Sequence, residues 1–186
     1  MLHEAALLRM AEVMLVEVLG RVRPQDEDVV LPPMHVRADV SRTIAVATAQ
    51  HLQDEADVRS ALTGGPQPVD PVVADAARRT CAVAAAQDDG DRVVLSNGEP
   101  TSVRALLLRA TVERSLLAHY VAAYLGSPAC PLPEELARPL WELTNPDARA
   151  WRRGGWFFEP LPLPPHVSWR DRFLLTAGHP PHPLGH

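Results

Sequence analysis

The chain has 186 residues, of which 46% are hydrophobic and 22% charged, and its formal net charge is −5 at pH 7. This length and balance predict a folded globular protein with a single domain and exclude an intrinsically disordered chain. The acidic balance gives no basic face for nucleic acid or an anionic membrane, so neither is expected as a partner. All 18 basic residues are arginine, which excludes lysine chemistry such as a Schiff base.

Four long helical segments are predicted before residue 126. Apolar positions at three- and four-residue steps predict helices over residues 2–22, 38–62, 72–87 and 101–125. Gly64 and Gly65 end the second helix and Gly126 ends the fourth. A short β-like run, residues 92–95, precedes the Asn97-Gly98 turn. We therefore expect an all-α fold with a four-helix bundle over residues 1–126.

The segment after Gly126 is rich in proline and holds all four tryptophans. It predicts a short helix over 132–143, an extended stretch over 155–163 and a final helix over 168–176, with Ser168 as its N-cap. We expect residues 127–178 to form an arm that wraps the bundle, within one domain of residues 1–178. Residues 179–186, with several prolines and histidines, are expected to be a disordered tail.

Neither a membrane span nor a cysteine-based centre is expected. Apolar runs are too short to cross a bilayer and the N-terminus lacks the character of a signal peptide, which predicts a cytoplasmic protein. Cys81 and Cys130 have no second cysteine at metal or redox spacing. We interpret them as a packing residue and an incidental thiol.

The most informative residue for function is Glu113. It falls on the same helical row as a set of apolar residues, Val103, Leu106, Ala110, Leu117, Tyr120 and Tyr124. A carboxylate inside the core must be paired, protonated or bound to a metal. His51 lies on the inward row of the second helix, so the two side chains can converge in one interior. They would then bind a metal or form a His–Glu hydrogen bond, unless His51 is an ordinary hydrogen-bonded core residue.

His119 and Glu55 are further candidates. His119 comes six residues after Glu113, which rotates it roughly 120° onto a neighbouring face of a regular helix, away from the row of Glu113. We expect it to point into a different cavity or to stack in the core. Glu55, one helical turn after His51, could ligate an ion, hold the imidazole or remain a solvated acid.

Several segments together carry a resemblance to a known family. They are the loop Arg23-Pro24-Gln25-Asp26, His51, the stop Leu62-Thr63-Gly64, the spacing from Glu113 to Gly126, and the runs Leu132-Pro133-Glu134-Glu135-Leu136 and Asp171-Arg172-Phe173-Leu174-Leu175. In order and spacing, over nearly the whole chain, these resemble the DinB-like helical bundles. Among those bundles they are most similar to the actinobacterial metal-binding relatives of mycothiol-dependent maleylpyruvate isomerase.

The resemblance implies a divalent metal, commonly zinc, that activates a thiol cofactor such as mycothiol, or a water. Its ligands would be a histidine of the second helix and an acid and a histidine four residues apart in the fourth. His51 and Glu113 match the first two, and Leu117 occupies the position of the third. The third ligand would then be His119, brought in by a helix irregularity, or Glu55; otherwise the chain is a metal-free member. We take His51, Glu113 and His119 as the expected metal set.

Three functions follow as expectations. The resemblance implies a thiol-dependent isomerase or transferase on a small organic substrate, with Glu113 and His51 as catalytic residues. The first alternative is a metal-free enzyme or binding protein of secondary metabolism, in which Glu113 is the general acid or base. The second is a scaffold bundle without catalysis. The expected partner is a small-molecule substrate, and a homodimer is a further expectation.

Overall fold

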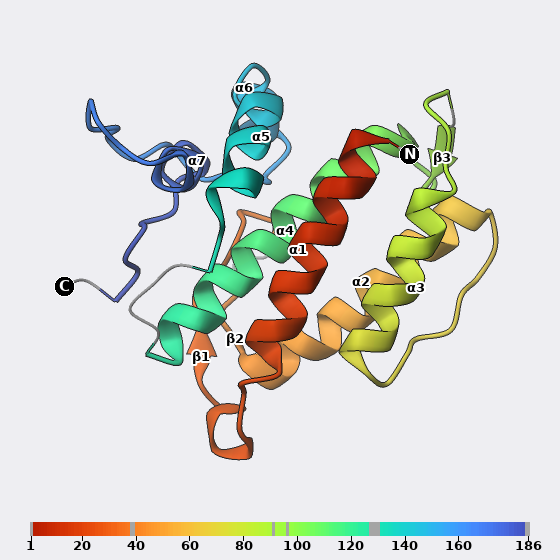
Figure 1. Ribbon diagram of the computed structural model, residues 1–186, viewed down its shortest axis with the longest axis horizontal. Helices are drawn as coiled ribbons and strands as arrows, with labels where there is room; N and C mark the ends of the chain where they lie inside the picture. The colour runs from red at the N-terminus through yellow and green to blue at the C-terminus, as the bar shows by residue number, and fades with distance from the viewer. Residues whose placement is uncertain (1, 38–39, 91, 96, 127–130, 185–186) are drawn as a thin grey trace. The chain divides into compact units, whose positions relative to one another are not determined.

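The computed structural model describes residues 2–37, 40–90, 92–95, 97–126 and 131–184. The described residues are mainly helical, which confirms the predicted all-α class (Figure 1). They form seven α-helices: α1 (His3–Leu19), α2 (Ile44–Thr63), α3 (Val73–Ala85), α4 (Val103–Tyr124), α5 (Glu134–Thr144), α6 (Ala148–Arg153) and α7 (Trp169–Ala177). A single 3-10 turn, η1 (Pro24–Asp26), follows α1. None of these helices combines the length and apolar character that a membrane span requires.

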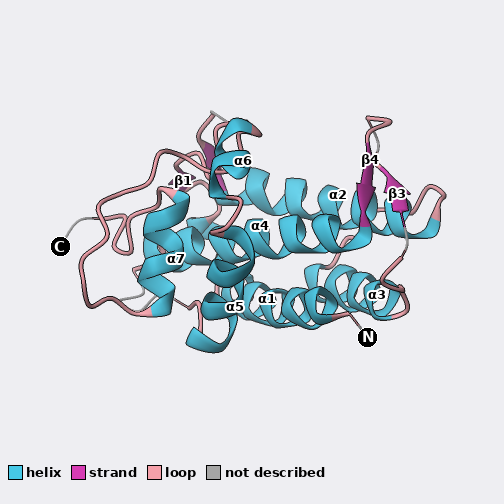
Figure 2. Ribbon diagram, turned by 90° about the horizontal axis from the view of Figure 1, so that it is seen from above, coloured by secondary structure: helices cyan, strands magenta, loops and turns pink. Residues whose placement is uncertain are grey.

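Two short antiparallel strand pairs interrupt the helices (Figure 2). β1 (Val30–Leu31) pairs with β2 (Arg42–Thr43), and β3 (Arg92–Val94) pairs with β4 (Pro100–Ser102). β3 confirms the predicted β-like run, whereas β4 was not predicted: residues 101–102, expected in the fourth helix, pair with β3, so α4 starts at Val103. Gly98 has a φ of 82°, a left-handed conformation that glycine adopts without strain. The hairpin leads directly into α4.

The second helix begins later than predicted. The expected start at residue 38 lies outside the described residues, and Val40, which falls inside the predicted helix, is 64% exposed and precedes the observed one. The backbone of residues 42–43 pairs with β1 and is therefore extended, so the helix starts at Ile44. From there on the inward row predicted to hold His51 is buried, since Ile44, Ala47, His51 and Val58 are all buried. Gly64, with φ 72°, ends the helix as expected.

The chain forms two compact units, which are described separately. Unit 1 comprises Met1–Arg21 and Ala45–Ser115, and unit 2 comprises Val22–Ile44 and Leu116–His186. In unit 1, α1 packs on α3. The apolar core of this unit includes Leu2, Ala5, Leu8, Val58, Leu62, Ala84, Val93, Val103, Leu106, Leu107 and Ala110. The expectation that residues 1–178 form one domain stays a prediction.

A buried arginine ties the connector between α2 and α3 to both helices. Arg59, 2% exposed, donates to the carbonyl of Pro68 at 2.7 Å and to Thr80 Oγ1 at 3.1 Å. Its Nη2 lies 2.9 Å from Asp70 Oδ2, and Asp70 is itself 5% exposed. The charge of Arg59 is therefore compensated inside unit 1, as a buried cation requires.

In unit 2, α5 packs on α7 around buried aromatic rings. Phe157 stacks on Trp151 at 5.0 Å between ring centroids and meets Phe173 edge-on at 6.5 Å. Ser168 caps α7 as predicted, since its hydroxyl accepts from the amide of Asp171 at 3.0 Å. The short helix α6 was not predicted.

The packed part of unit 2 extends past the predicted boundary at residue 178. His179 is fully buried, its amide donates to the carbonyl of Leu174 at 2.8 Å, and its Nδ1 lies 2.9 Å from the hydroxyl of Tyr120. The tail predicted from residue 179 therefore begins too early. The reason is that a single buried imidazole can anchor the chain even where flanking prolines prevent regular structure.

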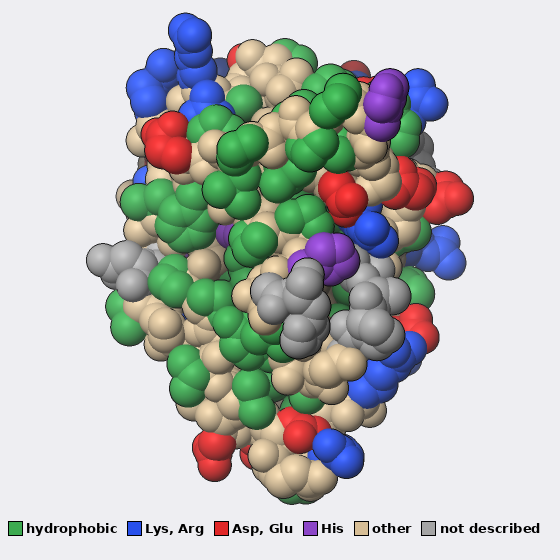
Figure 3. Space-filling model, turned by 90° about the vertical axis from the view of Figure 1, so that its left-hand side faces the viewer, with side chains coloured by type: hydrophobic (Ala, Val, Ile, Leu, Met, Phe, Trp, Pro, Cys, Tyr) green, Lys and Arg blue, Asp and Glu red, His purple; other side chains and the backbone are tan. Residues whose placement is uncertain are grey.

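Apolar side chains predominate on the face shown in Figure 3. Large apolar residues of unit 2 remain exposed, among them Val36 at 48%, Leu163 at 46% and Leu184 at 47%. Whether a second copy covers such residues stays a prediction.

Candidate functional site

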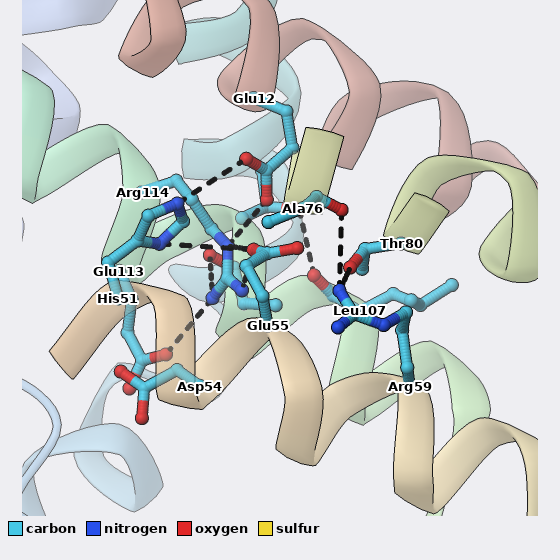
Figure 4. Close-up of polar contacts among 12 residues, drawn as sticks. Glu12, His51, Asp54, Glu55, Arg59, Ala76, Thr80, Leu107, Glu113 and Arg114 are labelled. Carbon is cyan, nitrogen blue, oxygen red and sulfur yellow. Dashed lines mark hydrogen bonds and ion pairs between the residues drawn. The ribbon is translucent and has the colours of Figure 1, made fainter. Parts of the chain in front are cut away.

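A cluster of buried ionisable side chains lies inside unit 1 (Figure 4). Glu12 comes from α1, His51 and Glu55 from α2, and Arg114 from α4. His51 and Glu55 are four residues apart and so project from the same face of α2. The four residues are 1%, 4%, 0% and 1% exposed, respectively. Charged groups buried to this degree require compensation within the cluster.

Arg114 lies between the two acids, Glu12 and Glu55, and donates hydrogen bonds to the Oε1 atom of each. Its Nε donates to Glu12 Oε1 at 2.7 Å and to Glu55 Oε1 at 3.1 Å, and its Nη2 also donates to Glu55 Oε1. Nη1 donates to the carbonyl of Ala110 at 3.3 Å. One guanidinium thereby holds two carboxyl groups that come from different helices.

Three other polar atoms of the cluster make no hydrogen bond with the described residues. Glu12 Oε2, Glu55 Oε2 and His51 Nε2 are all buried and without a partner. His51 Nε2 lies 3.9 Å from Glu12 Oε2, and His51 Nδ1 lies 3.8 Å from Glu55 Oε1. Buried polar atoms without a partner are rare in proteins and indicate a ligand, an ion or a proton that satisfies them.

Glu12, His51 and Glu55 fit the geometry of a metal site. Each can offer one ligand atom, and within the part of the chain that the structure describes this is the group of three whose ligand atoms lie within 4.8 Å of one another. Zinc binds nitrogen and carboxylate oxygen at about 2.0–2.2 Å, so two ligands of one ion are separated by up to roughly 4.4 Å. The 3.9 Å between His51 Nε2 and Glu12 Oε2 falls in this range. The cluster could hold a metal ion.

The pKa values of the cluster show a shortage of positive charge. Burial raises the pKa of Glu12 to about 8, and Arg114 offsets this only in part. For Glu55 burial is the largest cause and raises the pKa, but the charge of Arg114 and smaller contributions from Glu12, His51 and Thr80 together lower it to about 2. Burial, aided by Arg114, lowers the pKa of His51 to about 4. At neutral pH without a metal, Glu55 is therefore ionised, His51 is neutral, and Glu12 keeps a proton that it can share with Glu55.

Glu113 lies beside this cluster, outside the group of three. Its side chain is 30% exposed, and its Oε2 lies 3.5 Å from Arg114 Nη1. Figure 4 shows its carboxyl group near that of Asp54, away from Glu12, and the negative charge of Asp54 acts on it. Burial raises the pKa of Glu113 to about 7, with Arg114 opposing the shift. The core position expected for Glu113 is occupied by its neighbour Arg114.

His119 belongs to unit 2, whereas His51 and Glu113 belong to unit 1. Its Nε2 lies 3.1 Å from the carbonyl oxygen of Pro180, and its ring packs edge-on against Tyr120 at 5.2 Å. His119 is 1% exposed. Of the two placements expected for it, stacking in a core is the one observed.

Sequence reasoning missed Glu12 and Arg114, although a signal for each was present. Glu12 follows Leu8 by four residues and precedes Leu15 by three, which places it on the buried face of α1. Arg114 follows Ala110 by four residues and is equally on a buried row. A charged residue on an apolar row, the signal that points to Glu113, marks Glu12 and Arg114 as well.

Comparison of the chain with models of protein families, with curated proteins and with solved structures finds no match. The resemblance to the DinB-like bundles stays a prediction from residue order and spacing.

Proposed function

We propose that this chain binds a divalent metal ion through Glu12, His51 and Glu55, and that the ion serves an isomerase or transferase reaction on a small organic substrate. The supporting observation is that each of these three buried residues has one polar atom without a hydrogen-bond partner. Three protein ligands with one further position open is the arrangement of catalytic zinc sites.

The charges of the cluster support the same proposal. Three acids, Glu12, Glu55 and Glu113, contact a single arginine, Arg114, and so carry a formal excess of two negative charges. Without a metal, protons on Glu12 and Glu113 neutralise this excess, consistent with the raised pKa values of both groups. A divalent ion would supply the same compensating charge and displace the proton of Glu12, which would be its ligand.

In this proposal three residues of the site bind the ion and a fourth transfers protons. Glu12, His51 and Glu55 would hold the ion, whose chemistry is to polarise a carbonyl or to lower the pKa of a bound thiol or water. Glu113 is the acid with solvent access and a pKa raised to about 7, so it can give or take a proton near neutral pH. The order and spacing of the residues, which resemble those of the DinB-like bundles, lead us to propose zinc as the ion, mycothiol as the thiol and a four-helix bundle as the fold.

The proposal is tested by elemental analysis of the untagged full-length protein. We expect stoichiometric divalent metal in the wild type and loss of it in His51→Ala and Glu12→Gln. His182→Ala is the matched control, because His182 is an exposed histidine near the C-terminus and its loss should leave the metal content unchanged. Wild-type protein that holds no metal after purification and after incubation with Zn²⁺ would exclude this function.

A second candidate is favoured by the position of Arg114, which already brings a positive charge to both acids. In that case the chain is a metal-free enzyme or binding protein for a small molecule, with Glu113 as the acid or base. Activity or ligand binding that survives exhaustive chelation distinguishes it from the first proposal.

A further inference from the structure

The two acids of the candidate metal site are held in the same orientation by one side chain. Arg114 donates to Oε1 of Glu12 at 2.7 Å and to Oε1 of Glu55 at 3.1 Å, and the unpartnered atom of each acid is Oε2. An oxygen that already accepts from a guanidinium is the weaker ligand for an ion, so each of these carboxylates offers an ion chiefly its other oxygen. Both acids therefore favour ligation through a single oxygen.

We propose that Arg114 is a positioning residue that restricts Glu12 and Glu55 to one ligand oxygen each and so selects an ion of low coordination number, such as Zn²⁺, over Ca²⁺ or Mn²⁺. This inference rests on the proposed metal-binding function. It concerns which ion the site accepts, a property that follows from the hydrogen bonds of Arg114.

The coordination chemistry of the competing ions explains the selection. Zinc is satisfied by four ligands, so Glu12, Glu55 and His51 leave one position open. Calcium takes six to eight oxygens and commonly uses carboxylates in a bidentate manner. Imidazole also suits zinc better than the harder ions, which prefer oxygen.

The charge of Arg114 does not by itself prevent metal binding. Arg114 contacts Glu12, Glu55 and Glu113, and these three acids can balance one guanidinium together with one divalent ion. Groups that hydrogen-bond to the ligands of a metal typically change its affinity by about 10- to 100-fold when they are replaced.

The test compares Arg114→Lys with the wild type. Lysine keeps the positive charge but lacks the planar fork that reaches both Oε1 atoms, so both carboxylates regain two free oxygens. Arg59→Lys is the matched control, because Arg59 is also a buried arginine of unit 1 that pairs with an acid, Asp70. Among the described residues it reaches Glu55 only through Thr80, so it does not hold the Oε1 atom of either acid. Equilibrium dialysis gives the affinities for Zn²⁺, Mn²⁺ and Ca²⁺, and the visible spectrum of bound Co²⁺ reports the coordination number.

We expect Arg114→Lys to lower the affinity for Zn²⁺ relative to Mn²⁺ and Ca²⁺ by about 10- to 100-fold and to weaken the Co²⁺ absorption, as coordination increases. Arg59→Lys should change neither. Equal Zn²⁺ selectivity and an equal Co²⁺ spectrum in the wild type and Arg114→Lys would overturn the inference and leave the proposed function standing. If the wild type binds none of the ions, both fail.

A second variant tests the remaining possibility, that the guanidinium of Arg114 takes the place of a metal ion. Arg114→Met removes the cation altogether, and binding of an ion by this variant but not by the wild type would show that the guanidinium occupies the place of the metal. That outcome overturns both proposals in favour of the metal-free function. The folding of each variant is checked by circular dichroism before any affinity is measured.

Discussion

Replacement of Arg114 by methionine should destabilise the protein strongly, because it strands a buried charge. Arg114 is 1% exposed and donates to Glu55, which is 0% exposed. Arg114 is the main group that opposes burial and lowers the pKa of Glu55 to about 2, so its removal leaves Glu55 either as a buried carboxylate without a cation or as an acid that has to take up a proton. Removal of one partner of a buried ion pair costs about 3–5 kcal/mol. Glu12 adds little to this cost, because its pKa of about 8 leaves it protonated without the arginine.

The assay is urea unfolding at pH 7 in the presence of a chelator, so that bound metal does not contribute. Arg114→Met should lower the free energy of unfolding by about 3–5 kcal/mol. The double variant Glu55→Gln with Arg114→Met removes the stranded charge and should recover most of this loss. Arg21→Met is the control, since the pair of Arg21 and Glu17 is 63% and 67% exposed and should contribute less than about 1 kcal/mol.

Two results would refute this reasoning. The first is an Arg114→Met variant within about 1 kcal/mol of the wild type, the range of an exposed pair, which would mean that the acids near residue 114 find other compensation. The second is a double variant as unstable as Arg114→Met, which would place the loss in packing and not in the charge of Glu55.

Two further predictions concern pH and backbone conformation. The pKa of Glu113, raised from 4.5 to about 7, means that folding favours its protonated form, so its contribution to stability is present below pH 4.5 and is lost as the pH rises to 7. In Glu113→Gln this part of the decline should be missing from urea unfolding measured between pH 4 and 8; an unchanged pH profile contradicts the shift. Gly178→Ala should lower the melting temperature more than Gly64→Ala, although both glycines have positive φ values of 84° and 72°. At residue 178 an added Cβ would lie 2.6 Å from the Glu159 carbonyl oxygen, whereas at residue 64 it meets nothing within 4 Å. Equal losses would show that only the backbone conformation matters.

Local features of the sequence were enough to predict most of the helices. The periodic rows, the glycines at residues 64 and 126 and the Ser168 cap depend on contacts within a few residues, so they can be predicted without knowledge of a partner segment. β3 could be predicted for the same reason, from a β-like run next to a turn, but β4 could not, because it depends on pairing with β3. The late start of α2 could not be read in this way, because it depends on the pairing of residues 42–43 with β1.

The sequence also marked the right kind of residue for the site. His51 was identified from its inward row, and it is buried in the cluster together with Glu55. The choice between Glu113 and Arg114 was beyond the pattern. The two are adjacent and about 100° apart on the helix, so a broad apolar stripe can include either one.

By itself, then, the sequence determined the helical class, the approximate ends of the helices and the presence of charged residues on apolar faces. Only the tertiary structure decided which of those charges meet. Arg114 contacts Glu12 across 102 positions of the chain and Glu55 across 59. Contacts at such separation arise from the packing of whole helices, which no local pattern encodes, and they determine which atoms remain free to bind an ion.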